Sequence, residues 1–400
     1  MKKGWSWEWA VERPAAAAGA RIFSAPLILA MVATISLSGC ASGPAAGILS
    51  PSATSAPGAT EHQVLVATTR ARDQEAGAFF NGERSDTLNY AAMTVSVPAG
   101  HVAGNIEWPA TLSGDPNNAF TVRSAEYLEG DANFLRQLNS ELGKRKPGDR
   151  KVLLFIHGYN TPFSESLYRL TQLDEDANAF AVPVLFSWAS RGHLVDYIYD
   201  SNSATIARDQ LAHTLQLLFA SNAERIDILA HSMGNWVTVE ALRQLSIAGR
   251  LSAHDKVDLI FLAAPDIDLD VFKSQLRQFK EPRKPFYVIV SKDDLALGFS
   301  SFIAGNKPRL GSDPNTEDLT SLGATVIDMT DVGSSDPANH GKYAQLAKIA
   351  PQLTSVLARG IDRNRTAAPG AATGGAVGRG RSGLSSLGAL STEISIDRPR

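Results

Sequence analysis

Short apolar runs between residues 151 and 329 constrain the fold of this chain more than any other feature. They span residues 152–156, 183–188, 226–230, 257–263, 286–290 and 325–329. Helical stretches lie between most of them, and in the stretch around residue 211 the apolar positions 204, 207, 211, 215 and 218 share one face. Apolar strands that alternate with amphipathic helices predict a mostly parallel α/β sheet with helices on both faces.

The segment before residue 151 has a different pattern. Strand-like runs at 62–67, 93–97 and 120–127 are separated by Gly, Asn and Pro turns, and helical periodicity is first evident at 132–142. We predict an antiparallel lead-in at the edge of the larger sheet. A last helix is expected at 343–357, so that the folded domain covers residues 61–359.

The N-terminus has the pattern of an export signal over residues 1–39. Lys2, Lys3, Arg13 and Arg21 precede an apolar run at 22–37, and small residues follow it. An uncleaved membrane helix is the alternative, although the run is near the lower length limit for spanning a bilayer. Cys40 is the only cysteine, so no intramolecular disulfide can form.

Leu37-Ser38-Gly39-Cys40 resembles the lipobox of bacterial lipoproteins. This resemblance implies that Cys40 is lipidated and becomes the mature N-terminus, anchored in the cell envelope. By the same resemblance, Ala41 favours the outer membrane, with the protein facing the periplasm. Residues 40–60 are rich in Ala, Gly, Ser and Pro and predict a flexible tether, and the composition of residues 360–400 predicts a disordered tail.

The overall composition argues against several classes of protein. The formal net charge is -3 and hydrophobic residues make up 44% of the 400 residues, so neither nucleic-acid binding nor global disorder is expected. The sequence contains no H-E-x-x-H, no cysteine ligand pair and no G-x-G-x-x-G or P-loop at a strand end. We therefore expect no metal and no cofactor.

Ser232 lies between the predicted strand at 226–230 and a helical pattern that begins directly after it. A serine on such a turn is well exposed for nucleophilic attack, and the helix N-terminus faces the oxyanion that develops. Ala230 and Gly234 provide the small residues that the turn needs, although alanine replaces the first glycine of G-x-S-x-G. The pentapeptide alone is equally consistent with a structural turn, but its strand–turn–helix setting favours a nucleophile.

The strand at 152–156 ends in His-Gly-Tyr-Asn at 157–160. A glycine turn at this point lets a backbone N–H approach a substrate carbonyl, so we predict an oxyanion hole formed by the N–H groups of Tyr159 and Met233. A tight structural turn is compatible with the same residues. Asn160 and Trp188 are candidate walls of a substrate pocket, although each fits core or turn chemistry equally well.

His340 is the predicted base among eight histidines, because it lies in a turn-rich loop after the last predicted strand. His231 adjoins the serine, so its side chain should point away from Ser232. The predicted acid is Asp294, which follows the strand at 286–290. Asp293 and Asp266 remain alternatives, because sequence alone cannot decide which carboxylate faces the histidine.

From about Val64 to Leu357 the chain resembles a family of bacterial α/β hydrolases of poorly defined function, often exported lipoproteins described as esterase/lipase-like. The resemblance rests on Ala67-Thr68-Thr69-Arg70, Leu154-Phe155-Ile156-His157-Gly158-Tyr159-Asn160, Phe186-Ser187-Trp188, Ala230-His231-Ser232-Met233-Gly234-Asn235, Ala263-Ala264-Pro265-Asp266 and the loops of Asp294 and His340. It implies an α/β-hydrolase fold and a Ser-acid-His order.

These observations predict a membrane-tethered serine hydrolase that acts on small ester or related acyl substrates through an acyl-enzyme. Beyond one helix, no long insertion separates residues 183 and 226, so a large lipase-type lid is not expected. A non-catalytic envelope lipoprotein that uses the same scaffold for binding is the alternative. Transfer of the acyl group to an acceptor other than water is also compatible with the residues.

Overall fold

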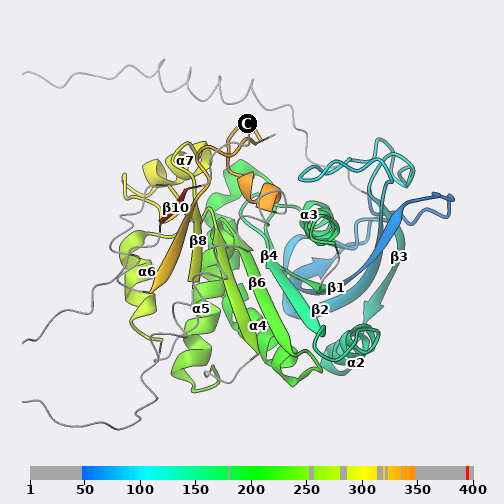
Figure 1. The fold of residues 1–400 in the computed structure, drawn as a ribbon, viewed down its shortest axis with the longest axis horizontal. Helices are drawn as coiled ribbons and strands as arrows, with labels where there is room; N and C mark the ends of the chain where they lie inside the picture. The colour runs from blue at the N-terminus through cyan, green and yellow to red at the C-terminus, as the bar shows by residue number, and fades with distance from the viewer. Residues whose placement is uncertain are drawn as a thin grey trace, which may run out of the picture. The chain divides into compact units, whose positions relative to one another are not determined.

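A twisted sheet forms the centre of the computed structural model, which describes residues 47–178, 181–251, 256–279, 286–312, 319, 323–334, 336–346 and 393–395. Among these residues the sheet has ten strands in the order β10-β9-β8-β7-β6-β4-β5-β1-β2-β3 (Figure 1). The order is not that of the sequence, because most connections cross over the sheet through a helix.

The predicted parallel strands are confirmed. They are β4 (Lys151–Ile156), β5 (Val182–Ser187), β6 (Arg225–His231), β7 (Val257–Ala263), β8 (Phe286–Val290) and β9 (Ala324–Asp328), all of which pair in parallel. Every residue of β5 and β8 is buried, as expected of strands that are covered on both faces. The carboxyl ends of these strands therefore share one edge of the sheet.

The N-terminal strands extend the sheet at one side, as predicted. The first of them, β1 (Thr60–Arg72), pairs with β2 (Phe80–Val97), which in turn pairs with β3 (Thr121–Leu128), and both pairings are antiparallel. On its other side β1 pairs in parallel with β5, over Leu65–Thr68 and Val184–Ser187. The antiparallel segment is thus hydrogen-bonded into the main sheet, and its first strand ends at the same edge as β4 and β5.

Helices cover both faces of the sheet. One face packs against α2 (Gly130–Gly143), α4 (Tyr197–Ala220), α5 (Met233–Ile247) and α6 (Leu269–Leu276). The opposite face packs against α3 (Phe163–Asp176) and the 3-10 turn η2 (Lys342–Gln345). A short 3-10 turn, η1 (Leu194–Asp196), precedes α4, and α7 (Leu295–Ile303) follows β8.

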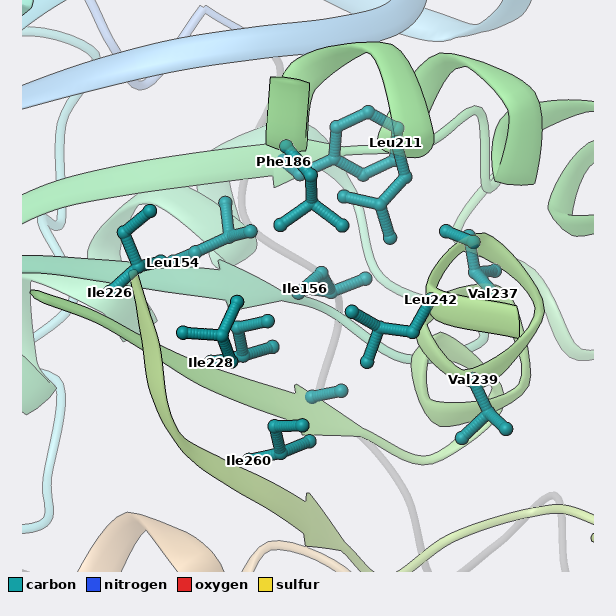
Figure 2. Close-up of a cluster of buried hydrophobic side chains, with 14 of the residues drawn as sticks. Leu154, Ile156, Phe186, Leu211, Ile226, Ile228, Val237, Val239, Leu242 and Ile260 are labelled. Atoms are coloured by element: carbon teal, nitrogen blue, oxygen red, sulfur yellow. The ribbon is translucent and has the colours of Figure 1, made fainter. Parts of the chain in front are cut away.

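The larger core lies between the sheet and α4 and α5. Figure 2 shows its side chains from both layers, with Leu154, Ile156, Phe186, Ile226, Ile228 and Ile260 from the strands and Leu211, Val237, Val239 and Leu242 from the helices. All of them are buried, and the burial of one such side chain contributes about 1.5–3 kcal/mol. This packing fixes the ends of β4 and β6, from which the candidate site is built.

The segment predicted as a tether differs from the expectation where the structure describes it. Ile48 and Leu49 are buried in the core beneath α3, and the Leu49 N–H donates to the Gly77 carbonyl at 3.0 Å. The Ser52 N–H donates to the Val122 carbonyl at 2.9 Å. The burial of Ile48 and Leu49 and these two hydrogen bonds thus attach the segment to the folded domain, although most of its other residues are small or polar.

The C-terminal prediction also differs at one place. Residues 393–395, inside the tail predicted to be disordered, form β10 (Glu393–Ser395), which pairs in parallel with β9 (Figure 1). Without β10, β9 would be the edge strand of the sheet. Its unpaired backbone N–H and C=O groups could then pair with a strand of another chain. The predicted helix at 343–357 is described only to residue 346, and begins as the η2 turn.

The predicted signal peptide at 1–39 and the lipidation site Cys40 lie outside the described residues and stay predictions. Within the described part of the chain, no helix has the length and apolar character needed to cross a membrane.

Candidate active site

Ser232 lies on a sharp turn between β6 and α5. Its backbone has φ 52° and ψ -125°, a conformation that costs a non-glycine residue about 1–3 kcal/mol. The Ser232 N–H donates to the Ala263 carbonyl at 3.0 Å, and Asn235 Nδ2 donates to the carbonyls of Ser232 and Ala263 at 2.8 and 2.9 Å. Hydrogen bonds from the neighbouring strand and from the helix therefore hold the turn in this strained conformation.

Two glycines allow the close approach of backbones that this turn requires. A Cβ at Gly234 would lie 2.3 Å from the His157 carbonyl oxygen, and a Cβ at Gly158 would lie 2.7 Å from the Ser232 Cβ. Ala230 is fully buried, so the fold accommodates the methyl group that replaces the first glycine of the motif. The loop after β4 consequently lies directly against the serine.

His340 and Asp294 meet at the ends of β9 and β8. The His340 Nδ1 atom lies 2.7 Å from Asp294 Oδ2, and the Asp294 side chain is fully buried. Burial alone would lower the pKa of His340, but the hydrogen bond and the negative charge of Asp294 outweigh it and raise this pKa. The imidazole therefore lies beside a carboxylate that stabilises its protonated form.

The loop that carries His340 is held by a second carboxylate. Asp336 Oδ2 accepts the backbone N–H groups of His340 and Gly341, both at 2.8 Å. The other Asp294 oxygen, Oδ1, accepts the Leu297 N–H at 3.0 Å and caps α7. Asp336 thus holds the backbone at His340, and the Leu297 N–H holds the carboxylate of Asp294.

The two alternative aspartates have other partners. Asp293 accepts Lys342 Nζ at 2.7 and 2.9 Å, and its side chain is half exposed. Asp266 accepts Ser300 Oγ at 2.6 Å and lies 3.1 Å from Arg309 Nε. Within the described part of the chain, Asp294 is the member of the three that accepts a hydrogen bond from His340.

His231 contacts the histidine loop and belongs to its support. Its Nε2 lies 3.2 Å from the His340 carbonyl oxygen, and its ring stacks on Tyr343 at 4.2 Å between centroids. Burial, together with the adjacent His340, lowers the pKa of His231 well below its usual value. The ring is therefore neutral and donates Nε2–H to the carbonyl, which ties the turn at Ser232 to the loop of His340.

The predicted oxyanion loop is ordered by His157. The Trp188 N–H donates to His157 Nε2 at 3.1 Å, so the ring proton is on Nδ1, which donates to the Gly158 carbonyl at 2.8 Å. Because a trans peptide points its C=O and N–H in opposite directions, the Tyr159 N–H points away from His157. Met233 is the first residue of α5, where backbone N–H groups have no acceptor within the helix.

One of the two predicted pocket walls, Trp188, needs correction. Trp188 is fully buried, stacks on the His157 ring at 5.1 Å and donates Nε1–H to the His157 carbonyl at 2.8 Å, so it cannot line an open pocket. Asn160 has φ 55°, and its backbone N–H faces Asp200 Oδ2 at 3.4 Å. Trp188 thus supports the oxyanion loop from behind, because an aromatic residue that directly follows an inner strand is covered by the next layer. Asn160 is partly buried, and its role as a pocket wall stays a prediction.

A cavity of about 230 Å³ lies beside Met233 instead. It is lined by Tyr197, Ser201, Ala204 and Thr205 of α4, Met233 and Trp236 of α5, Asp266, Ile267, Asp268 and Val271 after β7, and Arg309. Its hydroxyl groups are partly engaged within the protein, since Ser201 Oγ donates to the Tyr197 carbonyl at 2.8 Å and Thr205 Oγ1 to the Ser201 carbonyl at 2.9 Å. The remaining walls are mainly apolar.

Sequence analysis assigned no role to two buried cations, although one of them, Arg70, ends the motif Ala67-Thr68-Thr69-Arg70. Lys342 is 4% exposed and bridges Asp293 to the carbonyls of Met329 and Thr330, at 3.2 and 2.6 Å. Arg70 is 1% exposed at the end of β1. The position of Arg70 at the end of the apolar run of β1 was the one signal in the sequence. Its hydrogen-bond acceptors come from distant segments, which lie close to it because β1 pairs with β5.

Comparisons with known proteins found a family model and several solved structures to which the chain is similar. A model of the family described as "Alpha/beta hydrolase of unknown function (DUF900)" matches residues 131–357. No curated protein matches the chain. Similar solved structures include a predicted CIB-like hydrolase from Thermoplasma acidophilum, at 15% identity over 54% of this chain and 89% of that one, with a TM-score of 0.32.

Two further solved structures are similar at the same level. Dienelactone hydrolase from Anabaena variabilis is 11% identical over 75% of this chain and 96% of that one, with a TM-score of 0.35. An esterase from Pyrobaculum calidifontis is 12% identical over 60% of this chain and 95% of that one, with a TM-score of 0.32.

Proposed function

Because the chain belongs to the α/β-hydrolase family of unknown function DUF900, we propose that it is a serine hydrolase that cleaves carboxylic esters or related acyl substrates. The observation that carries the proposal is the strained Ser232 turn at the same sheet edge as the His340–Asp294 hydrogen bond of 2.7 Å. A serine needs a base to become an effective nucleophile, and a base needs an acid that holds its tautomer.

In the proposed reaction, Ser232 Oγ attacks the acyl carbonyl while His340 Nε2 takes its proton, since Nδ1 is bonded to Asp294. The N–H groups of Met233 and Tyr159 stabilise the oxyanion, with support from the N-terminal end of the α5 dipole. Collapse of the tetrahedral intermediate breaks the ester C–O bond, and the leaving alcohol receives the proton from His340. Water then attacks the acyl-enzyme with His340 as base and releases the acid and free Ser232.

The cavity beside Met233 supports an uncharged acyl group of medium length as the substrate. A cavity of about 230 Å³ has room for several heavy atoms, because one water molecule takes up roughly 30 Å³ in the liquid. Trp236, Ile267 and Val271 provide apolar surface. Asp266 is paired with Arg309, which leaves Asp268 to repel an anionic acyl group.

Bulk at the cavity mouth should therefore change the preference for acyl length. Thr205 is exposed and lines the cavity, so Thr205→Trp is expected to lower kcat/KM for an octanoate ester about 10-fold or more and to spare the acetate ester. Ile206→Trp, at the next and half-exposed position outside the cavity lining, is the matched control. The measurement is hydrolysis of p-nitrophenyl esters from acetate to palmitate. Equal length profiles for both variants would remove the cavity from the substrate site.

Labelling with a fluorophosphonate probe tests the proposed function itself. We expect the full-length protein to form a covalent adduct that mass spectrometry assigns to the peptide containing Ser232, and we expect heat-denatured protein to remain unlabelled. A folded protein that does not react with the probe contradicts the proposal. That result would favour a binding protein that uses the hydrolase scaffold without catalysis.

A further inference from the structure

The guanidinium of Arg70 lies buried behind the oxyanion loop and joins three segments. Its Nε donates to Ser187 Oγ at 2.8 Å. Its Nη1 donates to the carbonyls of Ser190 and Asn81, at 2.7 and 3.2 Å. Its Nη2 donates to the Thr161 carbonyl at 2.6 Å. The loop after β4, the loop after β5 and the start of β2 are thus connected through one side chain.

No carboxylate lies within hydrogen-bonding distance of Arg70 in the described part of the chain, which is unusual for a buried cation. Asp200, whose negative charge acts on Arg70, accepts hydrogen bonds instead from Ser190 Oγ at 2.6 Å and from the Arg191 N–H at 3.0 Å. Burial lowers the pKa of Arg70 to about 9, an effect that the charge of Asp200 opposes. At neutral pH the fold therefore retains a positive charge that only neutral acceptors solvate.

This charge faces the ring that orients the oxyanion loop. Arg70 Nη2 lies 3.4 Å from His157 Nε2, the acceptor nitrogen of that ring. His157 in turn donates Nδ1–H to the Gly158 carbonyl at 2.8 Å. Each donor in such a chain polarises the next, and a cation at its head polarises all of them in the same sense. The last group in the chain is the Gly158–Tyr159 peptide, whose N–H points away from the hydrogen-bonded carbonyl.

We propose that Arg70 is a positioning residue for the oxyanion hole: through Thr161 it fixes the loop, and through His157 it polarises the Gly158–Tyr159 peptide so that the Tyr159 N–H becomes a stronger donor to the oxyanion. The inference rests on the proposed function. Because its effect appears only when negative charge develops on the substrate, it lowers the barrier for the chemical step more than it strengthens substrate binding.

Kinetics of Arg70→Gln test this role. Loss of a complete oxyanion donor lowers kcat about 10²–10³-fold, so weakening one donor is expected to lower kcat about 10–100-fold with KM nearly unchanged. Affinity for a trifluoromethyl ketone, which forms a charged adduct with serine, should fall in parallel with kcat. Arg70→Lys, which keeps the charge but has fewer donors, should recover part of both losses.

Arg84→Gln is the matched control. Arg84 is partly buried, whereas Arg70 is fully buried, and Arg84 donates to Ser203 Oγ at 2.8 Å and to the Tyr199 carbonyl at 3.0 Å, both in α4. We expect this variant to lose thermal stability with little change in kcat. If Arg70→Gln behaves in the same way, Arg70 is structural and the inference is wrong.

A second variant covers the case in which Arg70→Gln does not fold. His157→Gln removes the ring that connects Arg70 to Gly158, and should reproduce the fall in kcat and in ketone affinity. Unchanged values in folded His157→Gln would refute the relay. A protein that fluorophosphonate does not label at all would instead refute the proposed function, so the two failures are distinguishable.

Discussion

Replacing Ser232 with alanine is expected to lower kcat for ester hydrolysis about 10⁶-fold, the loss that follows removal of the nucleophile from a serine–histidine–aspartate system. The remaining oxyanion donors cannot compensate, because without Oγ no acyl-enzyme forms. Steady-state hydrolysis of a p-nitrophenyl ester, with active sites counted by fluorophosphonate in the parent, measures the change. The variant itself should not react with the probe.

Ser246→Ala is a suitable control for this experiment. Ser246 is as buried as Ser232 and lies near the other end of α5, the helix that follows Ser232, where its Oγ contacts the Gln278 carbonyl at 3.4 Å. We expect this variant to retain kcat within about twofold. A Ser232→Ala protein that keeps more than about a hundredth of the parental kcat would mean that another group attacks the substrate.

Asp294→Asn is expected to lower kcat about 10⁴-fold, because an amide in place of the carboxylate holds the imidazole in the wrong tautomer. Asp293→Asn, one residue away, should lower it less than about tenfold, since Asp293 is paired with Lys342 and not with His340. This pair of variants decides between the two carboxylates that the sequence left open. A larger loss in Asp293→Asn would reverse the assignment.

The same pair of variants differs in pH dependence. The base must be neutral, so kcat/KM rises with pH through the pKa of His340, which Asp294 raises above the usual value of a histidine. Removing the negative charge of Asp294 removes that stabilisation of the imidazolium, so the acid limb should move to lower pH. In Asp293→Asn the limb should stay in place. A rate profile between pH 5 and 9 measures both.

The sequence predicted most of the fold because a strand buried on both faces must be apolar at nearly every position, as β5 and β8 are. The Ser232 turn was also evident, since strand, small residues and helix are consecutive in the chain. What could not be predicted depends on side-chain direction. Asp293 and Asp294 differ only in which of them faces His340, and Trp188 was misjudged because its exposure depends on the layer above it.

Arg70 illustrates a further limit. Its acceptors at residues 161, 187 and 190 are about a hundred positions away along the chain and become neighbours only because β1 pairs with β5. No short-range sequence pattern predicts that β1 pairs with β5. Ile48 and Leu49 show the reverse case, in which two apolar residues in an otherwise polar segment were sufficient to anchor it.

The backbone at Ser232 has a consequence for attempts to stabilise this protein. A non-glycine residue with φ 52° and ψ -125° is in an unfavourable backbone conformation, which lowers the free energy of unfolding. The hydrogen bonds around the turn offset this loss. Glycine at this position would relieve the strain and abolish the chemistry. Selection for heat resistance alone would therefore favour replacement of Ser232 by glycine, so a thermostability screen of this protein should also measure the proposed hydrolase activity.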